Sequence, residues 1–227
     1  MPRSYHEGMR PAKMIEIFTD KYPYIGPIIW ILSIQYFMVQ ALVASAWTSR
    51  YSLLTNAISD LGNTTCGQYS GRYVCSPEHG LMNASFIMLG ITMATGSLLI
   101  YQEFKESVAS LVGFSLMAVA GFGTLVVGLF PENTVPALHT LGATMPFLLG
   151  NIGLVVLGLS LDLPKSLRIY TVISGVVSLI ALIPFMAHQY LGLGFGGMER
   201  IVAYPQTIWL IVFGIYISHS HYERRKA

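Results

Sequence analysis

The sequence predicts an all-α membrane protein, a bundle of six transmembrane helices with both the N and C termini in the cytoplasm. Three observations support this fold class. The 227 residues are 53% hydrophobic and only 11% charged, whereas a soluble domain carries about a quarter charged residues. Six long stretches contain no charged residue at all. The Lys and Arg residues gather in alternate connections between these stretches.

Each charge-free stretch is long enough to cross a bilayer, because a helix of about 20 residues rises roughly 30 Å. The predicted spans cover residues 25–47, 80–101, 108–130, 140–161, 169–187 and 201–218. We therefore expect a cytoplasmic N-terminal segment at residues 1–24 and a single six-span domain at residues 25–218. Residues 219–227 form a basic cytoplasmic tail, which we expect to contact anionic lipid head groups.

Glycines are frequent in the third and fourth predicted spans, for example Gly121, Gly123 and Gly142. Small residues let helix backbones approach closely where lipid gives no hydrophobic driving force. The connections 102–107 and 162–168 are short and polar, so the helices they join are expected to be antiparallel neighbours. Together these features predict one compact bundle.

Charge placement orients the bundle. Of the 13 Lys and Arg residues, ten fall on the side of the termini and three fall in the longer connections on the other side. Those three are Arg50, Arg72 and Arg200. Because cytoplasmic loops are enriched in Lys and Arg, the longer connections are predicted to face outward or into a lumen. They cover residues 48–79, 131–139 and 188–200.

Cys66 and Cys75 share the first outer connection, where a disulfide is allowed. Short tails and little soluble mass favour a multi-pass protein of a prokaryotic cell membrane. A net charge of +2 without a basic run on a soluble domain argues against a nucleic-acid partner. We expect membrane lipids as partners, and the small-residue helix faces permit a homo-oligomer.

Polar residues that could carry chemistry collect at the predicted outer ends of the helices, while no charged residue falls within a predicted span. Ion-coupled carriers usually place a carboxylate near the middle of the membrane, so a coupled transporter is disfavoured. The candidate catalytic residues are Ser59, Asp60, His139 and Glu199. The candidate substrate-binding residues are Asn83, Glu132, His188 and Arg200.

Three interpretations of this polar layer remain open. In the first, the residues only cap helices and contact head groups, as in a non-enzymatic scaffold or lipid-binding protein. In the second, the protein is a zinc-dependent lipid hydrolase. Its zinc ligands would be Asp60, His79, His139 and His188.

The third interpretation is a metal-free head-group pocket. Arg200 would bind a phosphate there, helped by backbone N–H groups of the glycine-rich segment 192–197. His139 or His188 would act as acid or base if the bound lipid is turned over.

Several of these motifs resemble a known family. The segment 56–62 (NAISDLG), Asn83 and Phe86, the segment 127–143 from VGLFP to HTLGA, and the segment 197–201 (GMERI) resemble the prokaryotic membrane family called domain of unknown function 998. Residues 58–62 and 139–143 are also distantly similar to the six-span damage-regulated autophagy modulator, Frag and Sfk group. One branch of that group is implicated in remodelling the lipid part of glycosylphosphatidylinositol anchors.

The favoured hypothesis is therefore lipid or head-group binding or remodelling at the outer leaflet. Whether the protein is an enzyme stays open at this point.

Overall fold

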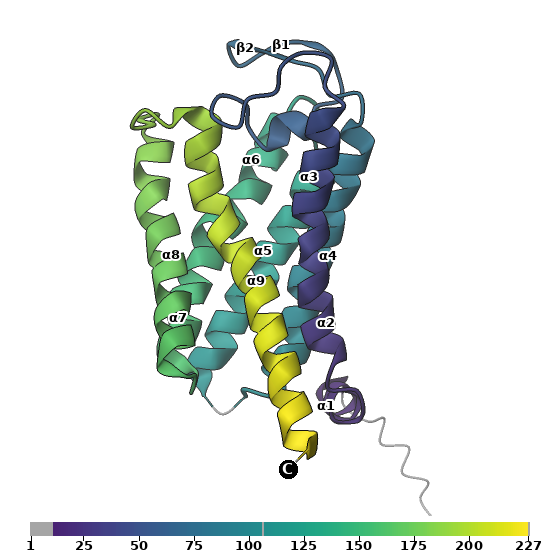
Figure 1. Ribbon diagram of the computed structural model, residues 1–227, viewed down its shortest axis with the longest axis vertical. Helices are drawn as coiled ribbons and strands as arrows, with labels where there is room; N and C mark the ends of the chain where they lie inside the picture. The colour runs from purple at the N-terminus through teal and green to yellow at the C-terminus, as the bar shows by residue number, and fades with distance from the viewer. Residues whose placement is uncertain (1–10, 106, 227) are drawn as a thin grey trace, which may run out of the picture.

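The computed structural model describes residues 11–105 and 107–226 as a bundle of long helices capped at one end by a loop (Figure 1). Six of the described helices are long and apolar enough to cross a membrane, which confirms the predicted six-span, all-α class. Residues 1–10 of the predicted N-terminal segment and residue 227 of the predicted tail lie outside the described residues.

A short helix, α1 (Pro11–Lys21), precedes the first span. That span is continuous through α2 (Ile25–Ile31), η1 (Leu32–Ile34) and α3 (Gln35–Ser45). The other spans are α4 (His79–Tyr101), α5 (Val108–Leu129), the continuous helix α6 (Pro136–Thr144), η3 (Met145–Gly150) and α7 (Asn151–Ser160), then α8 (Lys165–Met186) and α9 (Gly194–Lys226).

The spans form a closed ring. Each packs on the next along the chain, and α9 returns to pack on α2. The fourth span is distorted at η3, a π-helical turn that contains Pro146. Proline has no backbone N–H and breaks the regular ladder of helix hydrogen bonds, and π turns are often found near functional sites.

Three spans begin four or more residues earlier than the charge pattern predicts, and one of them is α8, which begins at Lys165 rather than at residue 169. α9 begins at Gly194 rather than at residue 201, so Glu199 and Arg200 lie inside this helix and are buried. α6 begins at Pro136 rather than at residue 140, so His139 lies in its first turn. In α9, the hydrogen bond from Ile58 to Glu199 and those from Arg200 to backbone carbonyl oxygens let both side chains lie buried at a point where the charge pattern predicts the end of a span. α9 also continues to Lys226, so the described part of the basic tail is helical.

Close packing of α4 and α5 depends on two glycines. A Cβ on Gly90 would lie 2.5 Å from the carbonyl oxygen of Gly121, and a Cβ on Gly121 would lie 2.6 Å from the backbone nitrogen of Ala94. At the end near the termini, Trp30 packs edge-on against Trp209 with ring centroids 5.2 Å apart. Small residues thus bring two backbones together, and aromatic residues fill the core between α2 and α9.

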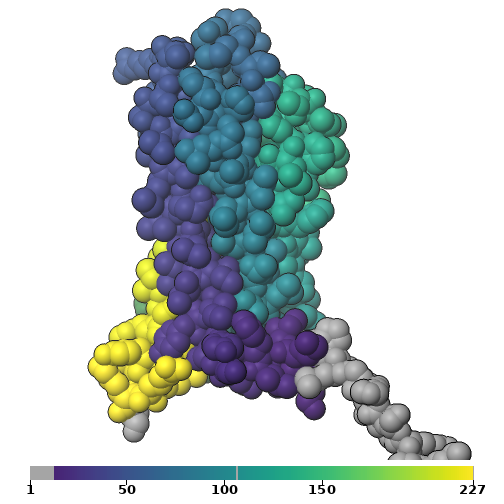
Figure 2. Space-filling view, turned by 90° about the vertical axis from the view of Figure 1, so that its right-hand side faces the viewer, coloured from purple at the N-terminus to yellow at the C-terminus, as the bar shows by residue number. Residues whose placement is uncertain are grey.

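The first long connection covers the opposite end of the bundle from α1 and the C-terminal end of α9 (Figures 1 and 2). It contains η2 (Ser59–Gly62) and an antiparallel hairpin of β1 (Gly67–Tyr69) and β2 (Arg72–Val74). A disulfide between Cys66 and Cys75 closes the base of the hairpin. We call residues 46–78 the cap.

We expect Gly90→Ala to lower the free energy of unfolding by about 1–3 kcal/mol, because the added methyl group overpacks the contact between α4 and α5. Gly80→Ala is the matched control in the same helix, since a Cβ there meets nothing within 4 Å. Thermal unfolding of both variants in detergent, followed by tryptophan fluorescence, checks this. Equal stability of the two variants would show that the helices are not packed at Gly90.

Candidate functional site

Arg200 ties the cap to α9. Its Nη1 donates to the carbonyl oxygens of Leu53 and Asn56, both at 2.9 Å, and to that of Gly196 at 2.8 Å. Its Nε donates to the hydroxyl of Tyr204 at 3.1 Å, and its Nη2 donates to the hydroxyl of Tyr51. The guanidinium is therefore used to hold the cap, which explains why Arg200 is buried inside a helix.

The start of α9 fits against the cap because it is rich in glycine. A Cβ on Gly196 would lie 1.9 Å from the carbonyl oxygen of Asn56. The N–H of Gly197 donates to the carbonyl oxygen of Leu54 at 3.1 Å. One of the free N–H groups at the start of the helix is thus satisfied by the cap.

Asp60 and Arg72 form an ion pair inside the cap. The Nε and Nη2 atoms of Arg72 each lie 2.6 Å from a carboxylate oxygen of Asp60. Asp60 also accepts from the side chain of Asn56 at 3.1 Å and from the N–H of Ala57 at 3.0 Å. Asp60 is fully buried, and all these bonds hold the turn before η2 to the hairpin.

Two further carboxylates meet the cap where η2 begins. The N–H of Ile58 donates to Glu199 of α9 at 2.6 Å. The next residue, Ser59, donates its hydroxyl to Glu132 at 2.8 Å, and the amide of Asn63 donates to the other oxygen of Glu132 at 3.5 Å. Among the described residues, neither Glu132 nor Glu199 has an ion-pair partner.

An outer cavity of about 800 Å³ lies beneath the cap. Its polar wall includes Ser59, Arg72, Glu132, His139 and Glu199. Its remaining wall comes from α6, from the end of α8 and from the start of α9. Those lining residues include Thr140, Ala143, Thr144, Phe147, Phe185, Met186, His188, Tyr190 and Phe195.

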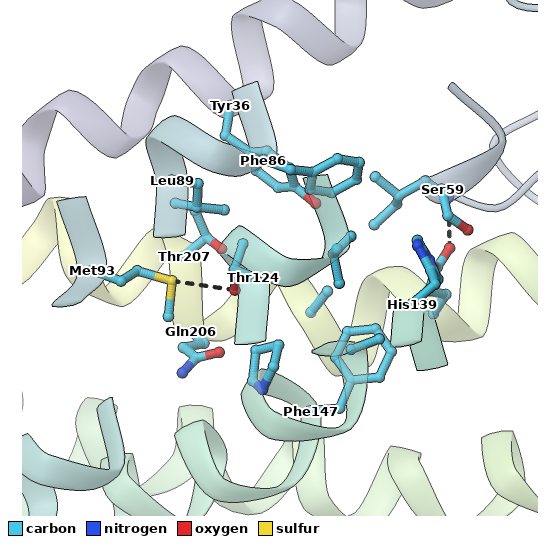
Figure 3. A pocket seen from close by; sticks show the side chains of 16 residues that line it. Tyr36, Ser59, Phe86, Leu89, Met93, Thr124, His139, Phe147, Gln206 and Thr207 are labelled. Carbon is cyan, nitrogen blue, oxygen red and sulfur yellow. Dashed lines mark hydrogen bonds between the residues drawn. The ribbon is translucent and has the colours of Figure 1, made fainter. Parts of the chain in front are cut away.

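A smaller inner cavity of about 50 Å³ continues toward the middle of the bundle. It shares Ser59, His139, Ala143, Phe147 and Glu199 with the outer cavity. Figure 3 shows the polar residues Ser59 and His139 at one side of it. The rest of its wall is largely apolar, with Tyr36, Phe86, Leu89, Met93 and Gln206. Thr124 and Thr207 add further polar groups to this inner wall.

The outer cavity reaches the side of the bundle between α6 and α8. Thr144 of α6 and Met186 of α8 both line the cavity and are exposed at the surface. Both residues lie in helices able to cross a membrane. The cavity therefore has a lateral mouth between two spans as well as a polar end beneath the cap.

The cap perturbs its titratable groups. Burial, followed by the negative charge of Asp60, raises the pKa of Glu132 from 4.5 to about 8. Burial lowers the pKa of Arg72, but its bond to Asp60 and the charge of that carboxylate outweigh burial and leave the pKa raised. Burial also raises the pKa of the Tyr69 phenol. At neutral pH Glu132 is thus mainly protonated and able to exchange its proton.

The structure brings five of the predicted site residues to one cavity and leaves the others outside it. Ser59, Glu132, His139 and Glu199 line the outer cavity, with His188 also on its wall. Asp60 and Arg200 lie behind this wall, in the bonds that hold the cap. Asn83 donates to the carbonyl oxygen of Gly62 at 2.9 Å, which likewise supports η2.

The four proposed zinc ligands have separate partners. Asp60 pairs with Arg72, and the Nδ1 atom of each histidine hydrogen-bonds elsewhere: His79 to the carbonyl oxygen of Ser76, His139 to that of Phe130, and His188 to the hydroxyl of Tyr190, all at 2.9 Å. Within residues 11–105 and 107–226, no three His, Cys, Asp or Glu side chains are grouped as metal ligands. Zinc binding by these residues stays a prediction.

Sequence reasoning missed the role of Arg72 and the aromatic wall. Arg72 was noticed only as one of the few outer basic residues, although its position between two cysteines of a short hairpin hinted at an ordered environment. Tyr190 and Phe195 flank a glycine-rich turn. Aromatic residues are common near the ends of membrane spans, so the sequence does not mark these two as lining a cavity.

We expect Asp60→Asn to destabilise the protein by about 3–5 kcal/mol, because it leaves the Arg72 charge unpaired in a largely buried site. The double variant Asp60→Asn/Arg72→Met is expected to recover part of that loss, since it removes the unpaired charge. Thermal unfolding of the two single variants and the double variant measures the coupling. Strictly additive effects would contradict a direct ion pair.

The raised pKa of Glu132 predicts a pH effect of known sign. Between about pH 5 and pH 8 the folded protein keeps a proton that the unfolded chain has lost, so this group makes stability fall as the pH rises. Glu132→Gln, which still accepts from Ser59, should remove this contribution. As the pH rises from about 5 to 8, the melting temperature of the variant minus that of the unmodified protein should therefore increase by at least about 2–4 °C, which corresponds to roughly 1 kcal/mol. A constant difference across the range would contradict the raised pKa.

Comparison with known proteins gives one match. The profile of the family described as "Protein of unknown function (DUF998)" matches residues 31–216, which is most of the chain. No curated protein and no solved structure matches significantly. The more distant similarity to the autophagy modulator, Frag and Sfk group stays a prediction. The match over residues 31–216 contains four spans and most of the first and the last, and the chain therefore belongs to the DUF998 family.

Proposed function

We propose that the protein binds a membrane amphiphile at the outer leaflet, with the polar head beneath the cap and an alkyl chain between α6 and α8. One observation carries this proposal. The outer cavity of about 800 Å³ combines Ser59, Glu132 and Glu199 at one end with apolar side chains and a lateral mouth at the other. Ligand sites commonly have volumes of about 300–1,000 Å³.

The depth of the cavity suits an amphiphile. Phe147 lies about 16 Å along the helix axis from Pro136, where α6 begins. A hydrocarbon core is about 30 Å thick, so the apolar part of the cavity would reach roughly the middle of the membrane. An alkyl chain entering through the lateral mouth would stay in apolar surroundings along its whole path.

The proposed orientation rests on charge. The side of the termini carries ten of the 13 Lys and Arg residues, and cytoplasmic segments are enriched in these residues. The cap also contains the disulfide between Cys66 and Cys75, which is typical of an oxidising compartment. Both features support a cap at the outer face of a cell membrane.

Within this proposal the site residues have two kinds of role. Ser59, Glu132, His139 and Glu199 would contact the head group, because they line the cavity. Asp60 and Arg200 would keep the cap in place. If the bound amphiphile is remodelled, His139 would be the acid or base, since it faces the same cavity as both carboxylates.

A photoreactive fatty alcohol, with a diazirine on its alkyl chain, tests the binding proposal. We expect labelling of the cavity residues Thr144 and Phe185 above the labelling of lipid-facing Leu141. Ala143→Trp should reduce the cavity labelling by roughly tenfold or more, since Ala143 lines both cavities and a tenfold change needs only about 1.4 kcal/mol. Mass spectrometry of the labelled peptides gives the measurement.

Ala137→Trp is the matched control, because Ala137 lies exposed on the same helix and does not line either cavity. It should label like the unmodified protein. Labelling that is uniform over the lipid-facing helices, and insensitive to Ala143→Trp, would reject amphiphile binding and favour a non-enzymatic scaffold.

A further inference from the structure

The charges around the outer cavity point to one class of head group. We propose that the cavity selects amphiphiles whose head group is positively charged, such as a substituted ammonium, and holds that charge between Glu132 and Glu199. This inference rests on the proposed amphiphile binding and adds the chemistry of the ligand.

The two carboxylates bond to consecutive residues of the cap. Glu199 accepts from the N–H of Ile58 at 2.6 Å, and Glu132 accepts from the hydroxyl of Ser59 at 2.8 Å. Since Ile58 and Ser59 are consecutive residues and both carboxylates line one cavity, a single small head group can reach both. Both side chains are more than nine-tenths buried.

The hydrogen bonds of these carboxylates are incomplete. The described residues give Glu199 one hydrogen bond, from Ile58 to Oε2, and leave Oε1 available. Among the described residues, Glu132 accepts from the hydroxyl of Ser59 at 2.8 Å and from the amide of Asn63 at 3.5 Å. A buried carboxylate normally has an opposite charge or several donors, so a ligand cation would supply what the protein does not.

The cationic side chains near the cavity are already occupied. Arg72 lines the cavity, but its Nε and Nη2 atoms bind Asp60. Arg200 does not line the outer cavity and binds the cap. Among the described residues, a phosphate head group would therefore meet no unpaired guanidinium in the cavity wall, and its negative charge would oppose ionisation of both carboxyl groups.

Aromatic rings line the same cavity as the two carboxyl groups. Phe185, Tyr190 and Phe195 all line the cavity, and the Phe195 ring centroid lies 5.2 Å from that of Phe185 and 5.5 Å from that of Tyr190. Aromatic faces attract cations. The guanidinium of Arg72 already lies 5.0 Å from the Phe195 centroid, so this wall accepts a positive charge within the protein itself.

The titration of Glu132 is consistent with a missing cation. Burial and the charge of Asp60 raise its pKa to about 8, which means that its surroundings disfavour the negative form. A positive head group would favour that form. Cation binding would thus release a proton from the site.

Three photoreactive probes with one common alkyl chain test the charge preference. Their head groups are trimethylammonium, its neutral isostere 3,3-dimethylbutyl, and phosphate. With the full chain in a nonionic detergent, the trimethylammonium probe should label Thr144 and Phe185 about tenfold more than the neutral isostere, a difference of about 1.4 kcal/mol. The phosphate probe should label them least.

Glu132→Gln and Glu199→Gln should each lower the ratio of trimethylammonium labelling to neutral-probe labelling toward one. Glutamine keeps an acceptor for Ser59 or Ile58, and the ratio within one variant cancels any change in the cavity that affects both probes alike. Glu78→Gln is the matched control, because it removes an exposed carboxylate from the cap outside the cavity.

The possible outcomes separate the two proposals. Equal labelling by the charged and neutral probes, or strongest labelling by the phosphate probe, overturns the cationic head group and leaves amphiphile binding in place. Absence of specific labelling by all three probes rejects amphiphile binding itself. A preference that survives both glutamine variants overturns the assignment to Glu132 and Glu199.

Discussion

The site depends on one buried cation, the guanidinium of Arg200. It donates to carbonyl oxygens of Leu53, Asn56 and Gly196 and thereby joins the cap to α9. A guanidinium suits this task because it presents several donors in a rigid plane and stays charged. With the cap held there, Ile58 reaches Glu199 and Ser59 reaches Glu132. The cap is thus bonded to α9 on one side and to the loop before α6 on the other, and the cavity lies beneath it.

Some charged groups at the cap are paired with an opposite charge, and others are not. Asp60 and Arg72 neutralise each other within the cap, and Arg200 binds backbone carbonyl oxygens. Neither Glu132 nor Glu199 therefore has an ion-pair partner among the described residues. A protein optimised only for stability would gain from pairing or removing such buried carboxylates. Their retention beside an open volume is typical of a binding or proton-exchanging site.

Part of the site was predictable from single residues. Ser59, Glu132, His139 and Glu199 were predicted because they are polar, lie near helix ends and share one side of the membrane, and they do line one cavity. The separation of these residues from Asp60 and Arg200 was not predictable. All six are polar residues at comparable depth, and only their hydrogen-bond partners distinguish a cavity wall from a structural tie.

The sequence by itself determined the class of protein and the number of spans, because long charge-free stretches and glycine-rich helices have few alternatives in a membrane. It also placed the cap, the loop at 131–139 and the end of α8 on one side. Only the tertiary structure decided where α9 begins and which groups meet. The reason is that the charges of Glu199 and Arg200 end a hydropathy pattern, whereas in the folded protein hydrogen bonds to the cap, 140 or more residues away along the chain, allow both to lie buried within a helix.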